Sequence, residues 1–347
     1  MGEGAETVAG ARRRGARVSM ADVARLAGVS SQTVSRVSNG SPSVVPETRE
    51  RVLAAMEELG YRPNSAARAL KRGEFRTLGV IVFTLSTTGT LRTLEAIAGS
   101  AAQEGYAITL IPVAVPTQDG VLGAFTRLGE LTVDAVIVIM EVHLLDAVDV
   151  RLPQGLHVVV ADSEADERYG MVDTDQRGGT RTAVSHLLDL GHRTVHHLAG
   201  PKESFCAERR ARAWRERLRE GGCPVPEPVH GDWSAEGGYR AGLELAADPE
   251  CTAVFAANDQ MALGLLRALH ERGRSVPEDV SVVGFDDIAE AASFLPPLTT
   301  VRQDFHEVGR RLVAGALRRL RGESDGPGAS LVPTELVVRA STAPPPA

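Results

Sequence analysis

The sequence is poor in cysteine and contains no long hydrophobic stretch. Its three cysteines, Cys206, Cys223 and Cys251, include no CxxC pair. An odd number of cysteines without such a pair excludes a disulfide framework and a cysteine-based zinc cluster. The longest apolar runs, such as Ala135–Met140 and Val158–Ala161, have the length of a strand and are far too short to cross a bilayer.

Two further signatures are missing. Arg12, Arg13, Arg14 and Arg17 are not followed by an apolar stretch, so the N-terminus does not have the form of a secretory signal. There is no GxGxxG after a predicted strand and no GxxxxGK[ST], so nucleotide cofactors have no support and we expect no cofactor. These absences predict a cytoplasmic chain that has no contact with a membrane.

Length and charge indicate several domains with different partners. The chain has 347 residues, of which 43% are hydrophobic and 24% are charged, as in a globular protein of two or three domains. The net charge of −7 is unevenly distributed: residues 1–74 contain 12 Lys/Arg and 8 Asp/Glu, whereas the remainder contains 26 and 37. This pattern predicts a small anion-binding module attached to a body that does not bind anions.

Three short helices are predicted in the N-terminal part. The first is expected to begin at a capping box formed by Ser19 and Asp22 and to end at Gly28. The second has Ser30 as its N-cap, and the third has Pro46 in its first turn. The residues expected to face inward are Val23, Leu26, Ala27, Val34, Val37, Val52, Leu53, Met56 and Leu59. Two short helices joined by a glycine turn and packed on a third are typical of a helix-turn-helix.

From Thr77 onward, apolar strands alternate with helical segments. Two such series predict two doubly wound lobes of parallel sheet, with a ligand cleft between them at the carboxyl ends of the strands. The expected strands are Leu78–Phe83, Ile108–Val113, Ala135–Met140, His157–Ala161, Val195–Leu198, Ala253–Ala256 and Val280–Gly284. The expected helices are Leu91–Gly105, Val121–Leu131, Thr180–Leu190, Glu208–Gly221, Ala235–Ala247 and Asp259–Gly273.

Seven segments of the sequence resemble the LacI/GalR family of transcriptional repressors. They are ADVARLAGVSSQTVSRVSNG, VPETRERVLAAMEELGYRPNSAARAL, LLDLGHRTVHHLAGP, GDWSAEGGY, AANDQMALG, DVSVVGFDD and LPPLTTVRQDF, and they span residues from about 19 to 340. The resemblance implies an N-terminal all-α helix-turn-helix headpiece plus an α/β body. The body would have two doubly wound parallel-sheet lobes of the periplasmic-binding-protein type.

The resemblance also implies a division of the chain. The expected parts are a disordered tail (1–18), a helix-turn-helix DNA-binding domain (19–63), a hinge (64–75), a two-lobed sugar-binding and dimerisation domain (76–341) and a tail (342–347). Within the two-lobed domain, the N-lobe would contain about 76–174 and 303–333, and the C-lobe about 175–302.

In function, the resemblance implies a sequence-specific regulator and not an enzyme. We expect a repressor of sugar uptake or catabolism genes that a mono- or disaccharide, bound between the lobes, releases from a palindromic double-stranded operator. A homodimer is expected, because the ending RASTAPPPA cannot form the leucine heptad helix of tetrameric members. Two alternatives are a sugar-binding protein of the periplasmic type and an α/β enzyme. The first would require an export signal and no headpiece, and this chain shows the reverse on both; the second would require catalytic and cofactor constellations, which are missing.

The second predicted helix carries residues suited to reading DNA. Ser31, Gln32 and Arg36 lie on one face, opposite Val34 and Val37. Glutamine can pair with adenine and arginine with guanine in the major groove. Ser30, Thr33, Ser35 and Asn39 are suited to phosphates. The alternative is an ordinary polar surface helix, which the resemblance of the whole segment disfavours.

For the hinge, composition alone favours a flexible linker. The resemblance implies instead that the segment beginning at Asn64 folds into a helix against the minor groove. Leu70 would then be the wedge in the central base step, with Ala67 on the same face.

The residues that the resemblance assigns to a sugar effector are spread over the body. A sugar site needs planar polar groups for hydroxyls and an aromatic ring for the apolar sugar face. The assigned residues are Phe83, Asp162, Arg210, Trp233, Asn258, Asp286, Gln303 and Phe305, with Trp233 stacking and the two phenylalanines lining the wall. Any of them, taken singly, could be a strand-end residue that caps a loop. The chain departs from the family pattern at Thr84–Thr90, Thr174 and Cys206, so the resemblance indicates the class of ligand rather than the ligand.

Two catalytic or metal interpretations have little support. Asp286 and Asp287 could be paired acid and base, but adjacent residues at a strand end are expected to point to different sides. His196 and His197 begin a predicted strand and should face opposite ways, so with His192 they do not predict a metal site.

Overall fold

The computed structural model describes residues 18–62, 74–113, 118–131, 133–139, 156–161, 169–323 and 330–346. The chain forms two compact units, Met1–Phe75 and Arg76–Ala347. The predicted tail up to residue 17, the hinge residues Asn64, Ala67 and Leu70, and Asp162 lie outside the described residues. No helix in the described part combines the length and the apolar character that crossing a membrane requires.

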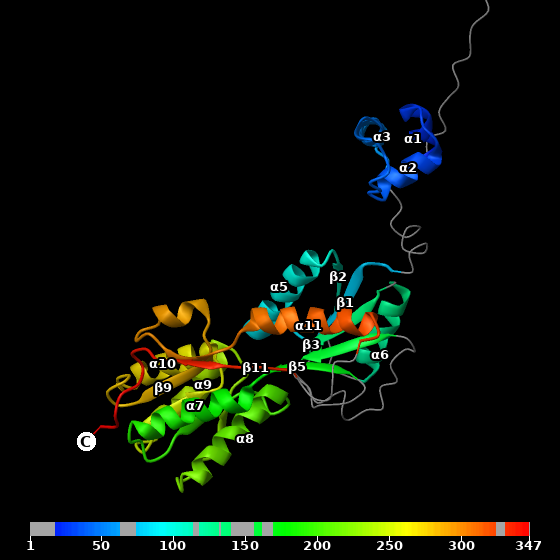
Figure 1. Ribbon diagram of the computed structural model, residues 1–347. Coiled ribbons are helices and arrows are strands. Elements are labelled where there is room, and N and C mark those ends of the chain that lie inside the picture. The colour runs from blue at the N-terminus through cyan, green and yellow to red at the C-terminus, as the bar shows by residue number, and fades with distance from the viewer. Residues whose placement is uncertain are drawn as a thin grey trace, which may run out of the picture. The chain divides into compact units, whose positions relative to one another are not determined.

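The described residues of the first unit, 18–62 and 74–75, form the helices α1 (Met20–Ala27), α2 (Ser31–Ser38) and α3 (Pro46–Glu58) (Figure 1). The predicted caps are confirmed. The Asp22 amide donates to Ser19 Oγ at 3.3 Å and the Ser19 amide donates to Asp22 Oδ2 at 3.0 Å. Gly28 ends α1 with φ of 65°, and the Thr33 amide donates to Ser30 Oγ at 3.1 Å. Each helix is thus delimited by signals that lie within a few residues of its ends.

The core of the first unit is small. It is formed by Val23, Ala24, Ala27, Val34, Val37, Val44, Val52, Ala55 and Met56. The prediction that Leu26 and Leu53 face this core is wrong, since their side chains are 45% and 51% exposed. A three-helix unit buries only a narrow stripe of each helix, and these two leucines lie beside that stripe.

The charge of the described headpiece is balanced. Residues 18–62 carry five arginines against five Asp/Glu. The basic excess of residues 1–74 therefore belongs to segments on either side of the folded headpiece.

The N-lobe of the second unit is built on a six-stranded sheet in the order β11-β5-β4-β3-β1-β2, in which all neighbours are parallel. Its strands are β1 (Thr77–Val82), β2 (Ala107–Pro112), β3 (Ala135–Ile139), β4 (His157–Ala161), β5 (Gly170–Thr174) and β11 (Ser330–Val332). Its helices are α5 (Thr88–Gln103), α6 (Gln118–Glu130) and α11 (Phe305–Leu320). One sheet face packs on α5 and α11 and the other on α6, so the lobe is doubly wound.

The C-lobe repeats this architecture with the order β12-β10-β9-β8-β6-β7. Its strands are β6 (His196–Ala199), β7 (Val229–His230), β8 (Ala253–Ala256), β9 (Ser281–Asp286), β10 (Thr299–Arg302) and β12 (Glu335–Val337). Its helices are α7 (Gln176–Asp189), α8 (Phe205–Glu220), α9 (Ala235–Ala247) and α10 (Asp259–Glu271), followed by the short 3-10 helix η1 (Ala289–Ser293). Helices α9 and α10 cover one face, and α7 and α8 the other. The predicted fold class is confirmed.

The C-terminal segment returns to the C-lobe, beyond the boundary at residue 302 that the sequence predicted. Strand β12 pairs antiparallel with β10, and Ser341 is fully buried. The Ala343 amide donates to Ser281 Oγ at 3.0 Å, and a ring nitrogen of His192 lies 3.0 Å from the Ala343 carbonyl oxygen. Residues up to 343 are therefore part of the lobe and not of a free tail.

Helices α9 and α10 pack unusually closely, at three glycines. A Cβ atom at Gly264 would overlap the carbonyl oxygen of Ala235 and the amide nitrogen of Tyr239. Gly238 and Gly242 face the backbone of α10 in the same way. Because backbone atoms lie on both sides of this contact, no side chain can rotate away to make room for a larger residue. A larger residue would have to push the two helices apart.

We expect Gly264→Ala to lower the free energy of unfolding by about 1–3 kcal/mol, since the extra methyl group must separate the two helices. This loss corresponds to a fall in Tm of roughly 2–4 °C per kcal/mol. The matched control is Gly99→Ala in α5, where a Cβ would meet no atom within 4 Å and should stabilise the helix. A Gly264→Ala protein whose Tm equals that of the wild type would show that the helices do not depend on this close approach.

Candidate functional site

Helix α2 presents the polar surface that the sequence predicts for DNA. Ser31, Gln32 and Arg36 are exposed, and Val34 and Val37 are buried on the opposite face. Ser30 and Asn39 are also exposed, and Thr33 and Ser35 are half-buried. The first turn of α2 contains no acidic side chain, so no carboxylate on that turn competes with a phosphate for the positive end of the helix.

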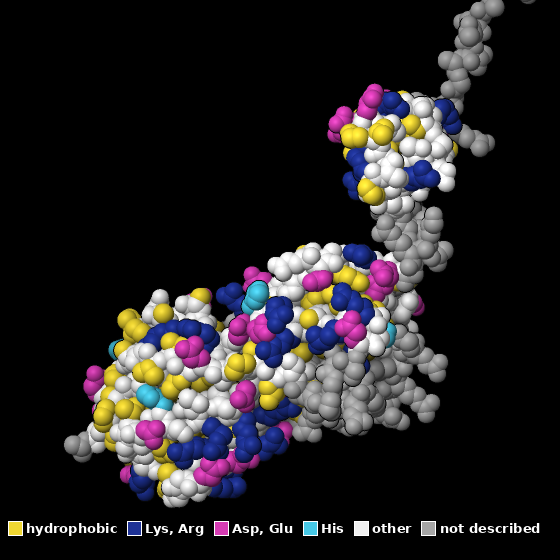
Figure 2. All heavy atoms as spheres, viewed as in Figure 1, with side chains coloured by type: hydrophobic (Ala, Val, Ile, Leu, Met, Phe, Trp, Pro, Cys, Tyr) yellow, Lys and Arg dark blue, Asp and Glu magenta, His cyan; other side chains and the backbone are white. Residues whose placement is uncertain are grey.

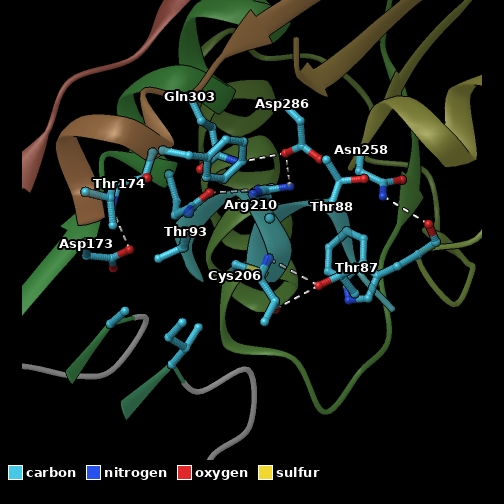
Figure 3. A pocket seen from close by; sticks show the side chains of 18 of the residues that line it. Thr87, Thr88, Thr93, Asp173, Thr174, Cys206, Arg210, Asn258, Asp286 and Gln303 are labelled. Atoms are coloured by element: carbon cyan, nitrogen blue, oxygen red, sulfur yellow. Dashed lines mark hydrogen bonds and ion pairs between the residues drawn. The ribbon is translucent and has the colours of Figure 1, made fainter. Parts of the chain in front are cut away.

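A cavity of about 640 Å³, its open mouth included, lies between the two lobes of the body. Figure 3 shows the side chains that line it. The C-lobe contributes Gln176, Cys206, Arg210, Trp233, Asn258 and Asp286. The N-lobe side is formed by Thr87, Thr88, Gly89, Thr90, Thr93, Ile139, Ala161, Val172, Asp173, Thr174, Phe305 and Val308, with Gln303 between the lobes.

Arg210 is the central cation of this cavity. It lies in the second turn of α8 and is only 3% exposed. Its Nε donates to Gln176 Oε1 at 2.8 Å, its Nη1 donates to the Ala257 carbonyl oxygen, and its guanidinium lies 3.8 Å above the centroid of the Phe285 ring. These contacts hold the guanidinium in one orientation, so a ligand would meet a preorganised donor.

Asp286, the last residue of β9, faces Arg210 across the cavity wall (Figure 3). Its Oδ1 accepts a hydrogen bond from Gln303 Nε2 at 2.6 Å and lies 3.9 Å from Arg210 Nη1. The residue has φ of 118°, and the following Asp287 has φ of 54°. Two successive non-glycine residues with positive φ store backbone strain, which is a common feature of functional sites.

The two adjacent carboxylates point to different sides, as predicted. Asp287 accepts hydrogen bonds from Arg302 Nε and Arg339 Nη2, each at 2.7 Å, and does not line the cavity. Asp286 therefore lines the cavity, whereas Asp287 binds two arginines outside it at the end of β9. The two carboxylates do not face a common site, as a catalytic acid and base would.

Asn258 and Trp233 form the next part of the C-lobe wall. Asn258 caps α10: the Met261 amide donates to its Oδ1 at 2.9 Å. Its Nδ2 donates to the Trp233 carbonyl oxygen at 3.0 Å, which fixes the loop after β7. Trp233 has φ of 70°, and its ring packs against the backbone of Gly200. The indole thus forms a rigid aromatic surface in the cavity.

The N-lobe wall is formed by threonines and by apolar side chains. Thr87 caps α5 by accepting the Thr90 amide, and Thr88, Thr90 and Thr93 follow on the same helix. The apolar residues of this wall are Ile139, Ala161, Val172, Phe305 and Val308. Of the departures that the sequence shows, residues 87–90, Thr174 and Cys206 therefore fall in the lining of the cavity.

Phe83 is not part of this wall. It packs partly buried on the cluster that contains Ile81, Phe125 and Leu128, on the α6 side of the sheet. Ile139, Ala161, Val172 and Val308 belong to the cluster on the other face. Successive residues of a strand alternate between the faces, so Phe83 follows Ile81 away from the cavity.

The sequence did not indicate three buried polar residues of the cavity, Thr93, Asp173 and Gln176. Asp173 lies in β5 and is 1% exposed, and Gln176, the first residue of α7, is 4% exposed. Asp173 and Gln176 stand where a parallel strand ends and a helix begins, a position that Asn258 shares. The segment GMVDT was not expected to be a strand, and the resemblance did not assign these two residues.

Asp259 is a fully buried carboxyl group directly behind the cavity. Its Oδ1 accepts from Thr300 Oγ1 at 2.6 Å and its Oδ2 accepts from the Ile288 amide at 2.9 Å. Burial, followed by the nearby negative charge of Asp286, raises the pKa of Asp259 to about 8. The folded protein therefore holds this proton more tightly than the unfolded chain does.

The raised pKa has a consequence for stability. Because the folded state binds the Asp259 proton more tightly, the contribution of this group to the free energy of unfolding falls as pH rises from about 4 to about 8. We expect Asp259→Asn to remove that slope and to have the higher relative Tm at pH 8–9, since the Thr300 hydroxyl can turn and accept from the new amide. Thermal unfolding of both proteins from pH 5 to 9 tests this expectation. Parallel curves would show that Asp259 is ionised throughout.

The three histidines considered above for a metal site, His192, His196 and His197, are buried. His197 is fully buried, hydrogen-bonds the Phe255 carbonyl oxygen and stacks on the Phe255 ring at 5.0 Å. Burial lowers the pKa of His197 to about 3, so the ring is neutral. Among the described residues, no group of three or more His, Cys, Asp or Glu side chains could hold a metal ion.

Together the two units define a class of protein. A helix-turn-helix unit followed by a two-lobed body with a polar cavity is the architecture of a ligand-responsive transcription regulator. Residues 19–64 match the model of the bacterial regulatory proteins of the lacI family, and residues 184–342 match that of the periplasmic binding protein-like domain.

The chain belongs to the lacI family. It is 34% identical to the lactose operon repressor of Escherichia coli (strain K12), over 94% of this chain and 91% of that protein. It is 35% identical to the HTH-type transcriptional regulator CelR of Thermobifida fusca, over 95% of this chain and 99% of that protein. These relatives are transcription regulators and not enzymes.

Solved structures of the family have the same fold. The lac repressor dimer bound to operator and the anti-inducer ONPF matches with a TM-score of 0.86 and 34% identity, over 94% of this chain and 100% of that one. The CelR–cellobiose complex matches with a TM-score of 0.69 and 32% identity, over 94% of this chain and 100% of that one.

Proposed function

We propose that this protein is a transcriptional repressor of sugar uptake or catabolism genes that a mono- or disaccharide releases from its operator. The cavity between the lobes carries this proposal. It places a buried guanidinium, a carboxylate and two amides beside an aromatic ring, and these groups suit the hydroxyls and the apolar face of a sugar.

Four polar residues and two aromatic residues would contact the sugar. Arg210, Asn258, Asp286 and Gln303 would bind hydroxyls, Trp233 would stack on a ring, and Phe305 would cover its other side. Asp162, which the resemblance assigns to the same ligand, stays a prediction because it lies outside the described residues. The CelR–cellobiose complex supports a disaccharide as one candidate effector.

The DNA surface would be that of α2. Gln32 and Arg36 would read base edges, Ser31 would lie beside them, and Ser30, Thr33, Ser35 and Asn39 would contact phosphates. The exposed positions of Ser31, Gln32 and Arg36 support this assignment. Asn64, Ala67 and Leu70 stay predicted hinge contacts.

The protein would act as a homodimer on an inverted repeat, since a two-fold protein reads a two-fold site. The structure of the lac repressor dimer on its operator supports this arrangement. Because its target is the chromosome, we place the protein in the cytoplasm.

A mobility-shift assay with fragments of the source genome, with and without a panel of mono- and disaccharides that includes cellobiose, tests the proposal. A repressor should shift a few fragments, and one sugar should reverse the shift. A protein that binds a sugar but shifts no fragment would instead be a binding protein without a DNA role.

Footprinting on a shifted fragment tests the dimeric mode. It should show two protected half-sites; a single protected half-site would contradict that mode.

A further inference from the structure

The two lobes are joined beside the cavity by an ion pair between Asp173 and Arg209. Asp173 belongs to β5 of the N-lobe and Arg209 to α8 of the C-lobe. Arg209 Nη1 donates to Asp173 Oδ2, and the Asp173 side chain is fully buried. The other carboxylate oxygen accepts the Thr174 amide at 2.7 Å, so the carboxylate is oriented by its own strand.

The position of this pair relates it to the cavity wall. Asp173 lines the cavity between the lobes, whereas Arg209 lines a second cavity of about 520 Å³ that also contains Arg177 and Arg212. Thr174 and Gln176 line both cavities. The ion pair therefore stands in the partition between them.

A second polar contact joins the lobes. Gln260, in the first turn of α10, donates to Thr88 Oγ1 in the first turn of α5. Thr88, like Asp173, lines the cavity between the lobes. Each contact thus has an N-lobe partner in the cavity wall and a C-lobe partner outside that wall.

The Asp173–Arg209 contact joins two opposite charges, whereas the Gln260–Thr88 contact joins two neutral groups, so the ion pair is the stronger of the two. A buried carboxylate that loses its cation must be solvated or protonated, and opening the lobes is the direct way to admit water. The guanidinium is 19% exposed and lies 5.8 Å from the centroid of the Phe205 ring on its own helix, so it is supported on the C-lobe side.

We propose that Asp173 and Arg209 are positioning residues that hold the N-lobe wall and the C-lobe wall of the cavity together. Calling the ligand of this cavity a sugar effector rests on the proposed function. The role of the ion pair in holding the two walls together does not. Loss of the pair widens the cavity and exposes its lining in the protein without any ligand.

The chain provides an internal probe of this opening. Of its two tryptophans, Trp214 is fully buried in the C-lobe core and Trp233 lines the cavity half-buried. Quenching of tryptophan fluorescence by acrylamide therefore reports access to Trp233.

The experiment compares full-length variants, with far-UV circular dichroism to verify folding. Arg209→Ala and Asp173→Asn should raise the acrylamide quenching constant and shift the emission to longer wavelength, and Arg209→Lys should restore most of the wild-type values. The matched control is Arg177→Ala, which breaks a 3.0 Å ion pair with Glu216 inside the C-lobe, on the rim of the second cavity. It should leave both values unchanged.

The outcomes decide the proposal without a sugar or DNA. Unchanged quenching in folded Arg209→Ala and Asp173→Asn would overturn it, as would an equal rise in Arg177→Ala. If Arg209→Ala does not fold, Asp173→Asn gives the same decision, because asparagine keeps a side chain of similar size while removing the charge that pairs with Arg209. Failure of the proposed function would appear elsewhere, as a wild-type protein that shifts no DNA and responds to no sugar.

Discussion

Replacing Asp286 by asparagine should weaken sugar binding by about 10- to 150-fold, the equivalent of about 1.5–3 kcal/mol for one hydrogen bond to a charged group. The carboxylate accepts from Gln303 and faces Arg210, so the substitution keeps an acceptor but leaves the buried guanidinium without its nearest negative charge. Asparagine is preferred to alanine because it tolerates the positive φ of this position. Operator affinity in the absence of sugar should stay within about twofold, as expected for a substitution outside the compact unit that contains α2.

The neighbouring residue provides the control. Asp287→Asn removes two ion pairs, with Arg302 and Arg339, but touches no part of the cavity. It should lower the Tm and leave sugar affinity unchanged, as measured by calorimetry with the sugar found in the panel. A loss of operator binding in folded Asp286→Asn would show that the cavity is structural, and the sugar-switch proposal would fail.

Arg36→Ala should cost about 1–3 kcal/mol of operator binding, or about 5- to 150-fold in Kd, if Arg36 reads a guanine. The side chain is exposed on the same face of α2 as Gln32, and it makes no ion pair with any residue that the structure describes. Its removal should therefore leave the fold of the headpiece intact.

Random DNA is the decisive comparison for Arg36. Binding to the operator should fall and binding to random sequence should change little, measured by mobility shift with each as the labelled fragment. An equal loss on both would make Arg36 a phosphate contact, and the reading of bases would then fall to Gln32 and Ser31.

The local features of the headpiece were predictable because each depends on a few adjacent residues. The box of Ser19 and Asp22, the cap at Ser30 and the left-handed Gly28 all follow from short-range chemistry. Leu26 and Leu53 were misplaced because the width of a buried stripe depends on what packs against it. That information is tertiary and is not present in the helix periodicity.

The same distinction explains the body. Apolar strands such as β3 and β8 were found, but β5 and β10 were missed because GMVDT and TTVR are not apolar runs. The cavity residues Asn258 and Asp286 were assigned by the resemblance, and both stand at strand ends. Asp173 was missed because its burial depends on Arg209, which comes from the other lobe. The sequence around Asp173 gives no sign of that partner.

The balanced charge of the folded headpiece has a consequence for how the protein responds to salt. DNA binding weakens with salt because cationic side chains displace counterions from phosphates, with a slope of about −0.9 per phosphate neutralised. Residues 18–62 have as many acidic as basic side chains, whereas residues 1–17 and 63–73 carry seven Lys/Arg and two Asp/Glu. Most of the ionic-strength sensitivity should therefore arise from the segments that flank the helix-turn-helix, and sequence preference from the helix itself.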